Sequence, residues 1–200
     1  MEQILSYLQN ISRKNLFQKK IILMPSYLDG NTLKKNLTLQ GFTAINFNIT
    51  TLFDIARDAF SPVLLKNEWK ILDSSLGQIL IFDILKVLSS EEKLSYFKLP
   101  SVTPSLALSI FRTIKEMRVS GYTSHNFPQK ILKKSIRMKD LQLIMSCYEG
   151  KLKDRRLIDE AELYTQAEKL KLREEKVHFI VPPNLSLNEL ELRYFNKKIK

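Results

Sequence analysis

The sequence predicts an α/β fold in which a small parallel sheet is interrupted by a large helical insertion. Three short apolar segments have the composition of strands, at residues 21–24, 45–49 and 177–181. A helical pattern separates the first two, and strands joined by a helix pair in parallel. From residue 71 to 170 apolar residues recur at helical spacing instead. We therefore expect residues 1–70 and 171–200 to form an α/β core and residues 71–170 an inserted helical subdomain.

The first predicted strand leads into a loop and a helix, the arrangement in which α/β proteins bind phosphate. Pro25 ends the strand, residues 26–32 have turn-forming composition, and Gly41 ends the helix that follows. A working phosphate loop requires Gly-x-x-x-x-Gly-Lys-Ser/Thr, so that a lysine reaches the phosphates. That lysine is missing here. We expect a degenerate, inactive nucleotide site made of Ser26, Gly30, Asn31 and Thr32.

Helix-start signals are present along the rest of the chain. An opening helix is marked by Ile4, Leu5, Leu8 and Ile11. Thr50 or Thr51 can cap the helix after the second strand, and Ser105 can cap one in the insertion. Pro182 and Pro183 close the third strand. A final helix is predicted with Ser186 as its cap, Glu189 completing a capping box, and Leu187, Leu190 and Tyr194 facing inward.

Composition limits the classes of function. The 200 residues contain 32 Lys and Arg against 21 Asp and Glu, and the surplus of 11 favours an anionic partner such as nucleic acid, or a solvated surface. The single cysteine, Cys147, permits no disulfide within the chain and fits a reducing cytoplasm. With no signal peptide and no apolar run of transmembrane length, we expect a cytoplasmic protein without a membrane partner.

Searches for catalytic constellations give negative results. His125 and His178 are far apart and lack the neighbours that a zinc site requires. No Gly-x-Ser-x-Gly elbow is present. Asp159, Glu160 and Glu162 cluster at a predicted helix start, where acids offset the helix dipole. We expect no catalytic residue, no metal site and no cofactor.

Basic residues are densest in two stretches. The first contains Lys130, Lys133, Lys134, Arg137 and Lys139, and the second Lys151, Lys153, Arg155 and Arg156. Such stretches neutralise the phosphates of nucleic acid or form a solvated face. Aromatic residues are not interleaved with them as in a base-stacking groove.

The order of elements resembles the first helicase domain of the UvrD-like superfamily, most closely the AddB/RexB-type subunits of bacterial helicase–nuclease repair complexes and their PD-(D/E)XK nuclease relatives. Four segments carry the resemblance. Residues 21–37 stand where the family has its phosphate-loop strand and helix, and residues 46–56 are similar to its DNA-contacting motif, which contains Thr and Ala. Lys139-Asp140-Leu141, Tyr148 and residues 157–164 together resemble the family's "K-D-L … Y … I-D-x-x-D-L" run. Residues 177–195 resemble the metal-binding strand and the helix that follows it.

The resemblance implies a P-loop-NTPase-like parallel sheet (helicase domain 1A-like) with an inserted helical subdomain (1B-like). Active members end the last strand with Asp-Glu, which holds Mg²⁺, but Pro182-Pro183 stand there in this sequence. The resemblance, together with this departure from it, therefore implies a scaffold for DNA repair and recombination that has no intact Walker motif and no ATPase activity. The family's nuclease lies downstream, and we expect the chain to be the N-terminal part of a longer protein, which would contain that nuclease.

By the same resemblance, the partners are DNA, as a single strand or a duplex end, and a partner helicase or nuclease subunit. The candidate DNA-binding residues are Thr50, Thr51, Phe53, Lys130, Lys133, Lys134 and Arg137. Two alternatives stay open: a protein-interaction module without DNA binding, and an ordinary nucleotide-binding α/β enzyme.

Overall fold

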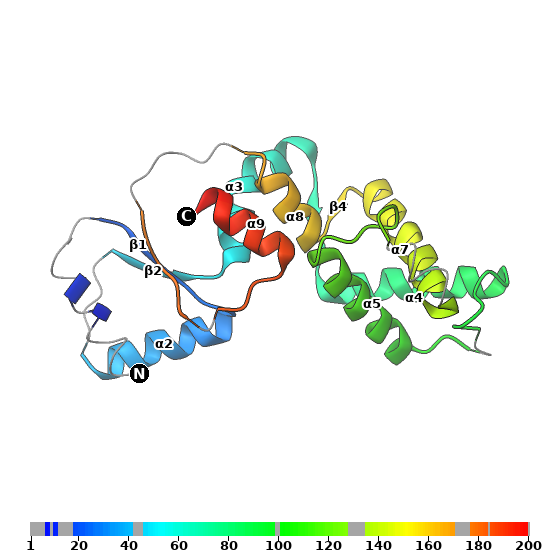
Figure 1. Ribbon diagram of the computed structural model, residues 1–200, viewed down its shortest axis with the longest axis horizontal. Helices are drawn as coiled ribbons and strands as arrows, with labels where there is room; N and C mark the ends of the chain where they lie inside the picture. The colour runs from blue at the N-terminus through cyan, green and yellow to red at the C-terminus, as the bar shows by residue number, and fades with distance from the viewer. Residues whose placement is uncertain are drawn as a thin grey trace.

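Three parallel strands form a sheet at one end of the molecule (Figure 1). A computed structural model describes residues 7–8, 10–11, 18–41, 46–98, 101–127, 135–170, 177–183 and 185–199. The strands are β1 (Lys20–Leu23), β2 (Phe47–Thr50) and β5 (His178–Ile180), in the order β2-β1-β5. β1 pairs in parallel with both neighbours. The predicted small parallel sheet is confirmed, within a mostly helical α/β protein.

The central strand β1 is buried along its whole length because it has a neighbour on each side. Its first residue, Lys20, is fully buried, and its ammonium group donates to the carbonyl of Gln18 at 3.0 Å and lies 5.3 Å from the ring centre of Phe47. Leu8, from the predicted opening helix, is also fully buried against the sheet. Ile4 and Leu5 of that helix, and residue 45 of the predicted second strand, lie outside the described residues.

Helix α2 (Tyr27–Leu39) connects β1 to β2 and begins earlier than predicted. Residues 27–32 form its first turns rather than a loop, because the Ser26 hydroxyl accepts a hydrogen bond from the Asp29 amide at 3.2 Å. Gly30 allows α2 to approach the sheet, since a Cβ there would lie 3.3 Å from the Cγ2 of Ile49. This glycine therefore serves packing of helix on sheet, and not a wide loop.

Three further helices pack together beside the sheet. They are α3 (Leu52–Asn67), α8 (Glu160–Ala167) and α9 (Glu189–Lys198), and their shared core includes Ala56, Phe60, Leu163, Tyr164 and Tyr194. Thr51 caps α3, as one of the two predicted alternatives. The predicted cap of α9 is wrong: the helix begins after Asn188, whose amide donates to Glu191 Oε2 at 2.7 Å, so Ser186 and Glu189 do not form a capping box.

Helices α4 (Ser74–Ser90), α5 (Pro104–Val119) and α7 (Ile136–Asp154) share one apolar core. Thr103 rather than Ser105 caps α5, because its hydroxyl accepts from the Leu106 amide and Pro104 occupies the first helical position. We call these helices the helical half, and the sheet with α2, α3, α8 and α9 the sheet half (Figure 1). No described helix is long and apolar enough to cross a membrane.

A second, two-stranded sheet joins the halves and was not predicted. β3 (Lys70–Ile71) and β4 (Leu157–Ile158) pair in parallel where the chain enters and leaves the helical half. Glu68 and Arg156, just before each strand, have positive φ angles of 55° and 53°. α8 follows β4 and packs on α3 and α9, within the sheet half. The predicted division at residues 70 and 171 stays a prediction.

Two glycines inside helices give a matched test of packing in the helical half. A Cβ on Gly77 of α4 would overlap the buried ring of Phe111, whereas a Cβ on Gly150 of α7 meets nothing within 4 Å. Gly77→Ala is expected to destabilise the protein by about 1–3 kcal/mol, because the ring must move. Gly150→Ala should stabilise it by about 0.5–1 kcal/mol through helix propensity. Urea unfolding measures both, and a gain from Gly77→Ala would contradict the packing.

A second prediction concerns alkaline stability. Burial raises the pKa of Tyr194 to about 12, from 10.0 for an ordinary tyrosine. Between these values the unfolded chain loses the phenol proton and the folded chain keeps it, so stability falls as the pH rises. Tyr194→Phe should make this fall less steep. The Tyr194 hydroxyl is buried with no hydrogen-bond partner among the described residues. Tyr194→Phe should therefore also raise the free energy of unfolding by about 1 kcal/mol at neutral pH.

Tyr164→Phe is the control for Tyr194→Phe. Burial, with the charge of Glu191, raises the pKa of Tyr164 as well, and its hydroxyl donates to Glu191 Oε1 at 3.4 Å. Tyr164→Phe should likewise reduce the loss of stability at alkaline pH, but it should not increase the stability at neutral pH. Chemical unfolding of the three proteins from neutral to alkaline pH gives both quantities, and identical pH profiles would disprove the assignment.

Candidate functional site

The carboxyl ends of β1 and β2 border a cavity of about 400 Å³ between the N-termini of α2 and α3. Ligands of parallel sheets bind at this edge, beyond the ends of the strands. The cavity brings together residues from both predicted sites: Ser26, Gly30 and Asn31 from the nucleotide set, and Thr50 and Thr51 from the DNA set. Folding therefore places two segments that are separate in sequence around one space.

Three hydroxyl groups at this edge are engaged in hydrogen bonds of the helices, two of them as helix caps. Ser26 Oγ donates to Asp29 Oδ2 at 2.6 Å while accepting from the Asp29 amide. Thr51 Oγ1 makes the same pair of bonds with Asp54, at 2.8 and 3.1 Å. Thr32 Oγ1 donates to the carbonyl of Leu28 at 2.9 Å. None of these three hydroxyls needs a ligand to complete its hydrogen bonding.

The charges at the edge do not favour a triphosphate. Asp29 and Asp54 lie in the first turns of α2 and α3, where they offset the positive ends of both helix dipoles. Arg57 is paired with Asp54 at 2.9 Å and with Asp58 at 3.2 Å. Three residues, 24–26, connect β1 to α2, so the backbone forms no loop that could surround a phosphate. Lys34 lines the cavity without an ion-pair partner among the described residues.

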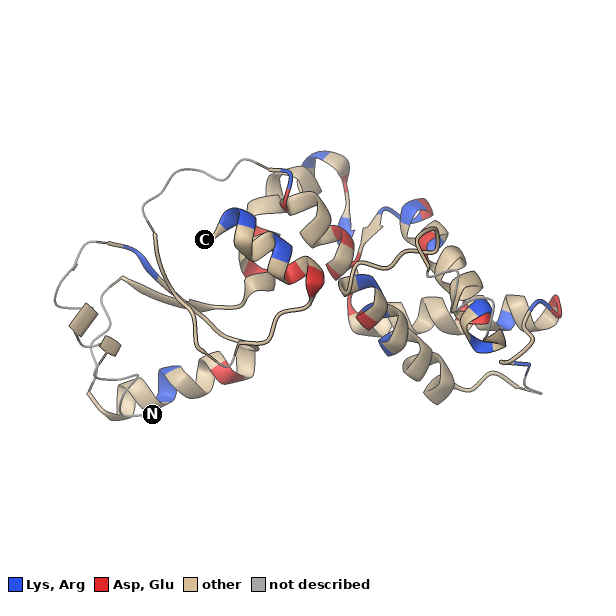
Figure 2. Cartoon of the chain, in the orientation of Figure 1, with Lys and Arg blue, Asp and Glu red and all other residues tan. Residues whose placement is uncertain are grey.

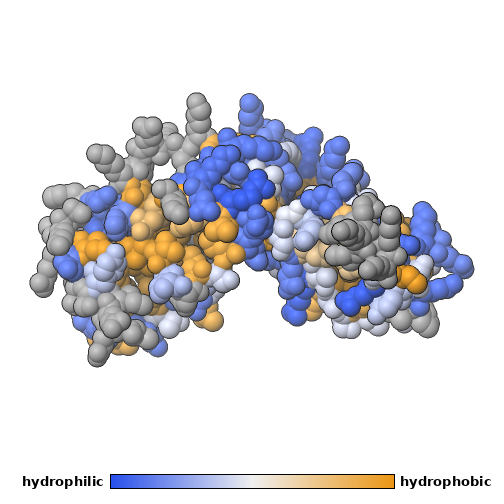
Figure 3. Space-filling model, in the orientation of Figure 1, coloured by the Kyte–Doolittle hydropathy of each residue, from blue (hydrophilic) through white to orange (hydrophobic). Residues whose placement is uncertain are grey.

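The neighbouring crevice, between the ends of β1 and β5, is apolar. Its volume is about 670 Å³, and Met24, Pro25, Pro182 and Pro183 are among the residues that line it. Asp29 carries the only charge among its described lining residues. Figure 3 shows hydrophobic side chains gathered over this part of the sheet half. The two neighbouring strands thus both run into proline, which has no N–H to donate to a phosphate and no carboxylate for a metal.

Of the other predicted DNA-binding residues, the structure describes Phe53 and Arg137, and neither lines the cavity between α2 and α3. Phe53 is half-buried and packs on the core of α3, α8 and α9. Arg137 begins α7 in the helical half, where its guanidinium lies 6.0 Å from the ring centre of Tyr96. Lys130, Lys133 and Lys134 lie outside the described residues. Lys and Arg are spread over both halves (Figure 2). DNA contact by these residues stays a prediction.

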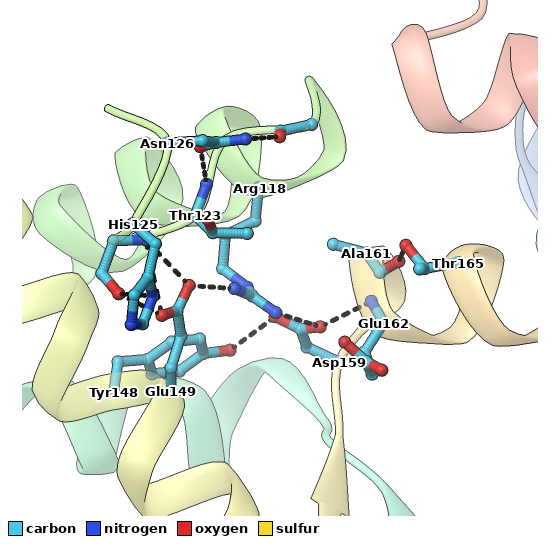
Figure 4. A network of polar contacts seen from close by, with 12 residues as sticks. Arg118, Thr123, His125, Asn126, Tyr148, Glu149, Asp159, Ala161, Glu162 and Thr165 are labelled. Atoms are coloured by element: carbon cyan, nitrogen blue, oxygen red, sulfur yellow. Dashed lines mark hydrogen bonds and ion pairs between the residues drawn. The ribbon is translucent and has the colours of Figure 1, made fainter. Parts of the chain in front are cut away.

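Sequence reasoning missed a buried ionic network where the two halves meet (Figure 4). Arg118, at the end of α5, donates from Nε and Nη2 to Asp159 at 2.5 and 3.2 Å, and from Nη1 to Glu149 at 2.5 Å. Arg118 and Asp159 are 6% and 7% exposed, so both charges are almost out of water. Burial lowers the pKa of Arg118, but the nearby Asp159 and Glu149 outweigh it and the pKa is raised.

Other groups complete the network. Ser124 donates to Glu149 Oε2 through its hydroxyl at 2.6 Å, and its backbone amide donates to the same carboxylate. Tyr148 donates to Asp159 Oδ2 at 3.4 Å, and burial together with the Asp159 charge raises the pKa of Tyr148. Asp159 also caps α8 by accepting from the Glu162 amide at 2.9 Å, so the three acids do lie at a helix start, as predicted.

The "K-D-L … Y … I-D" residues thus have structural roles in this chain. Besides Tyr148 and Asp159, Asp140 is 4% exposed and accepts from the amides of Ser95, Tyr96 and Phe97 at 3.0, 2.7 and 3.0 Å. Its carboxylate therefore holds the segment after α4 against α7. Among the described residues, no three His, Cys, Asp or Glu side chains are placed to hold a metal ion.

A scan against models of protein families matched none of them, and a search of curated proteins found no similar sequence. The functional interpretation therefore comes from the residues and geometry of this chain.

The buried ion pair gives a testable contrast with an exposed one. Asp159→Asn keeps a good helix cap but removes the charge beside Arg118, and is expected to destabilise the protein by about 3–5 kcal/mol. Glu68, paired with Arg156 on the surface, is the control, and Glu68→Gln should cost less than about 1 kcal/mol. Equal losses of unfolding free energy in the two variants would contradict the proposed importance of the network.

Proposed function

We propose that this chain is an ATPase-inactive, helicase-like scaffold region of a bacterial DNA-repair helicase–nuclease subunit, which binds DNA, its partner helicase, or both. The observation that carries the proposal is the pair of neighbouring strand ends. β1 and β5 lie side by side and run into Pro25 and into Pro182-Pro183, at the edge where a nucleotide-hydrolysing sheet holds phosphate and magnesium.

The chemistry of this edge supports a scaffold more than a nucleotide-binding enzyme. A nucleotide site would need free amides, a lysine and a metal-binding acid. Lys34 lines the cavity at the described edge, but the Ser26 and Thr51 hydroxyls cap helices, and only residues 24–26 connect β1 to α2. The neighbouring crevice is apolar, and its charge among the described lining residues is the carboxylate of Asp29. The net charge of +11 supports an anionic macromolecule as the partner.

The test is the salt dependence of DNA binding. Fluorescence anisotropy of a labelled single-stranded oligonucleotide, over a range of NaCl concentrations, should give a log–log slope of about −2 to −3 for three or four phosphate contacts. Lys133→Glu with Lys134→Glu should weaken binding equally for all base sequences, because phosphate contacts carry no base information. A matched control, Lys86→Glu with Arg112→Glu, changes the net charge equally on α4 and α5.

Absence of binding at low salt would remove DNA from the proposal and favour a protein-interaction module. Equal weakening by the two double variants would show that binding follows net charge, and that the assigned residues are wrong.

A further inference from the structure

A cavity of about 590 Å³ lies at the junction of the two halves, next to the buried network. We call it the junction pocket. Its lining comes from the β3 entry, the end of α5, the loop after it, α7, β4 and α8, and includes Trp69, Arg118, Leu152, Lys153, Arg156 and Glu162. Its size is within the range of sites for small organic molecules, and such sites often lie between structural units.

Part of the lining is apolar and includes one large aromatic ring. Leu152, Leu157 and Ile158 line the pocket together with Trp69, the only tryptophan of the chain. Trp69 is half-buried, and its ring centre lies 6.1 Å from that of Phe60, with the two rings tilted by 31°. An aromatic ring held in this way is suited to stacking on a flat, unsaturated ring of a ligand.

Cationic groups surround this apolar part. Lys153 and Arg156 are exposed at the rim, and Arg118 is buried in the wall. Three of the five N–H groups of Arg118 donate to Asp159 and Glu149, and the other two have no acceptor among the described residues. The Glu149 carboxylate is matched by Arg118 and Ser124, and Glu68 pairs with Arg156 on the surface. Glu162 also lines the pocket, and Lys153 is the rim cation without an ion-pair partner among the described residues.

We propose that the junction pocket binds one nucleotide unit, with the nucleobase against Trp69 and the phosphate near Lys153 and Arg156. A flat base matches the apolar part of the lining, and a phosphate matches cations that lie beside it on α7 and before β4. The bound nucleotide is either part of a DNA strand or a free mononucleotide. The first of these alternatives rests on the function proposed above. Among the described residues, neither the sheet edge nor the DNA-binding candidates Thr50, Thr51, Phe53 and Arg137 contribute to this pocket.

The experiment uses Trp69 as its own reporter. The full chain is titrated with a single-stranded oligonucleotide and, separately, with a free deoxynucleoside monophosphate, while tryptophan fluorescence is followed. Stacking should quench the signal in a saturable manner. Anisotropy of the labelled oligonucleotide in parallel samples reports DNA binding anywhere on the chain, so a failure of the pocket and a failure of the proposed function give different results.

The variants separate the rim from general charge. Lys153→Gln with Arg156→Gln should reduce the log–log salt slope of oligonucleotide quenching by about 1.4, the share of two phosphate contacts. Lys86→Gln with Arg112→Gln removes equal charge from α4 and α5 and should leave the slope unchanged. Trp69→Leu should weaken oligonucleotide binding measured by anisotropy about tenfold. Thermal melting by circular dichroism checks that each variant is folded.

Each outcome decides the proposal. Quenching that depends on the rim residues supports it. Anisotropy change without quenching would overturn the pocket and leave the proposed function intact. Quenching by the mononucleotide without oligonucleotide binding would support the pocket and remove DNA as its source. No quenching by either ligand, or equal effects of the two double variants, would overturn the proposal.

Discussion

The pairing of Arg118 with Asp159 and Glu149 is the interaction on which the arrangement of the two halves depends. Arg118 belongs to α5 and Glu149 to α7, both in the helical half, whereas Asp159 begins α8 in the sheet half. Because Arg118 and Asp159 are almost fully buried, neither can lose the other without a large cost in stability, whereas Glu149 is partly exposed. The short β3–β4 sheet lies beside this network, and the chain passes from one half to the other through its two strands.

The same network explains why motif-like residues need not indicate activity. Asp140, Tyr148 and Asp159 look like parts of a helicase-like run, yet each is used to hold one segment against another. The sheet edge follows the same rule, since Ser26 and Thr51 complete their hydrogen bonds as helix caps. In this chain the polar groups near a possible nucleotide site are largely committed to structure.

The main sheet could be predicted because its strands are short apolar runs bounded by proline or polar residues, and because a connecting helix makes the pairing parallel. The strands β3 and β4 could not be predicted, since a strand of two residues shows no periodicity in the sequence. The start of α2 was misplaced because Ser26 and Gly30 suit a turn as well as a capped helix. The contact of Gly30 with Ile49 that favours the helix is visible only in three dimensions.

For the candidate site, the sequence indicated both segments that meet at the sheet edge, since parallel strands end at the same side. It also placed Arg137 in the helical part of the chain, and Arg137 lies in α7 of the helical half, outside the cavity at this edge. Arg118 had a signal that was not used: it continues the apolar stripe of Phe111 and Ile114 at helical spacing, where a charge must be paired. Its partners, 31 and 41 residues away, could not be identified from spacing.

The most direct test of the central claim, that the sheet is a scaffold without nucleotide chemistry, is calorimetric titration of the chain with Mg·ATP. A sheet edge with prolines at two neighbouring strand ends and no phosphate loop predicts no hydrolysis and no heat of binding that depends on Asn31 or Lys34. Saturable binding with micromolar affinity, abolished by a substitution at Asn31 or Lys34 beside β1, would contradict the account.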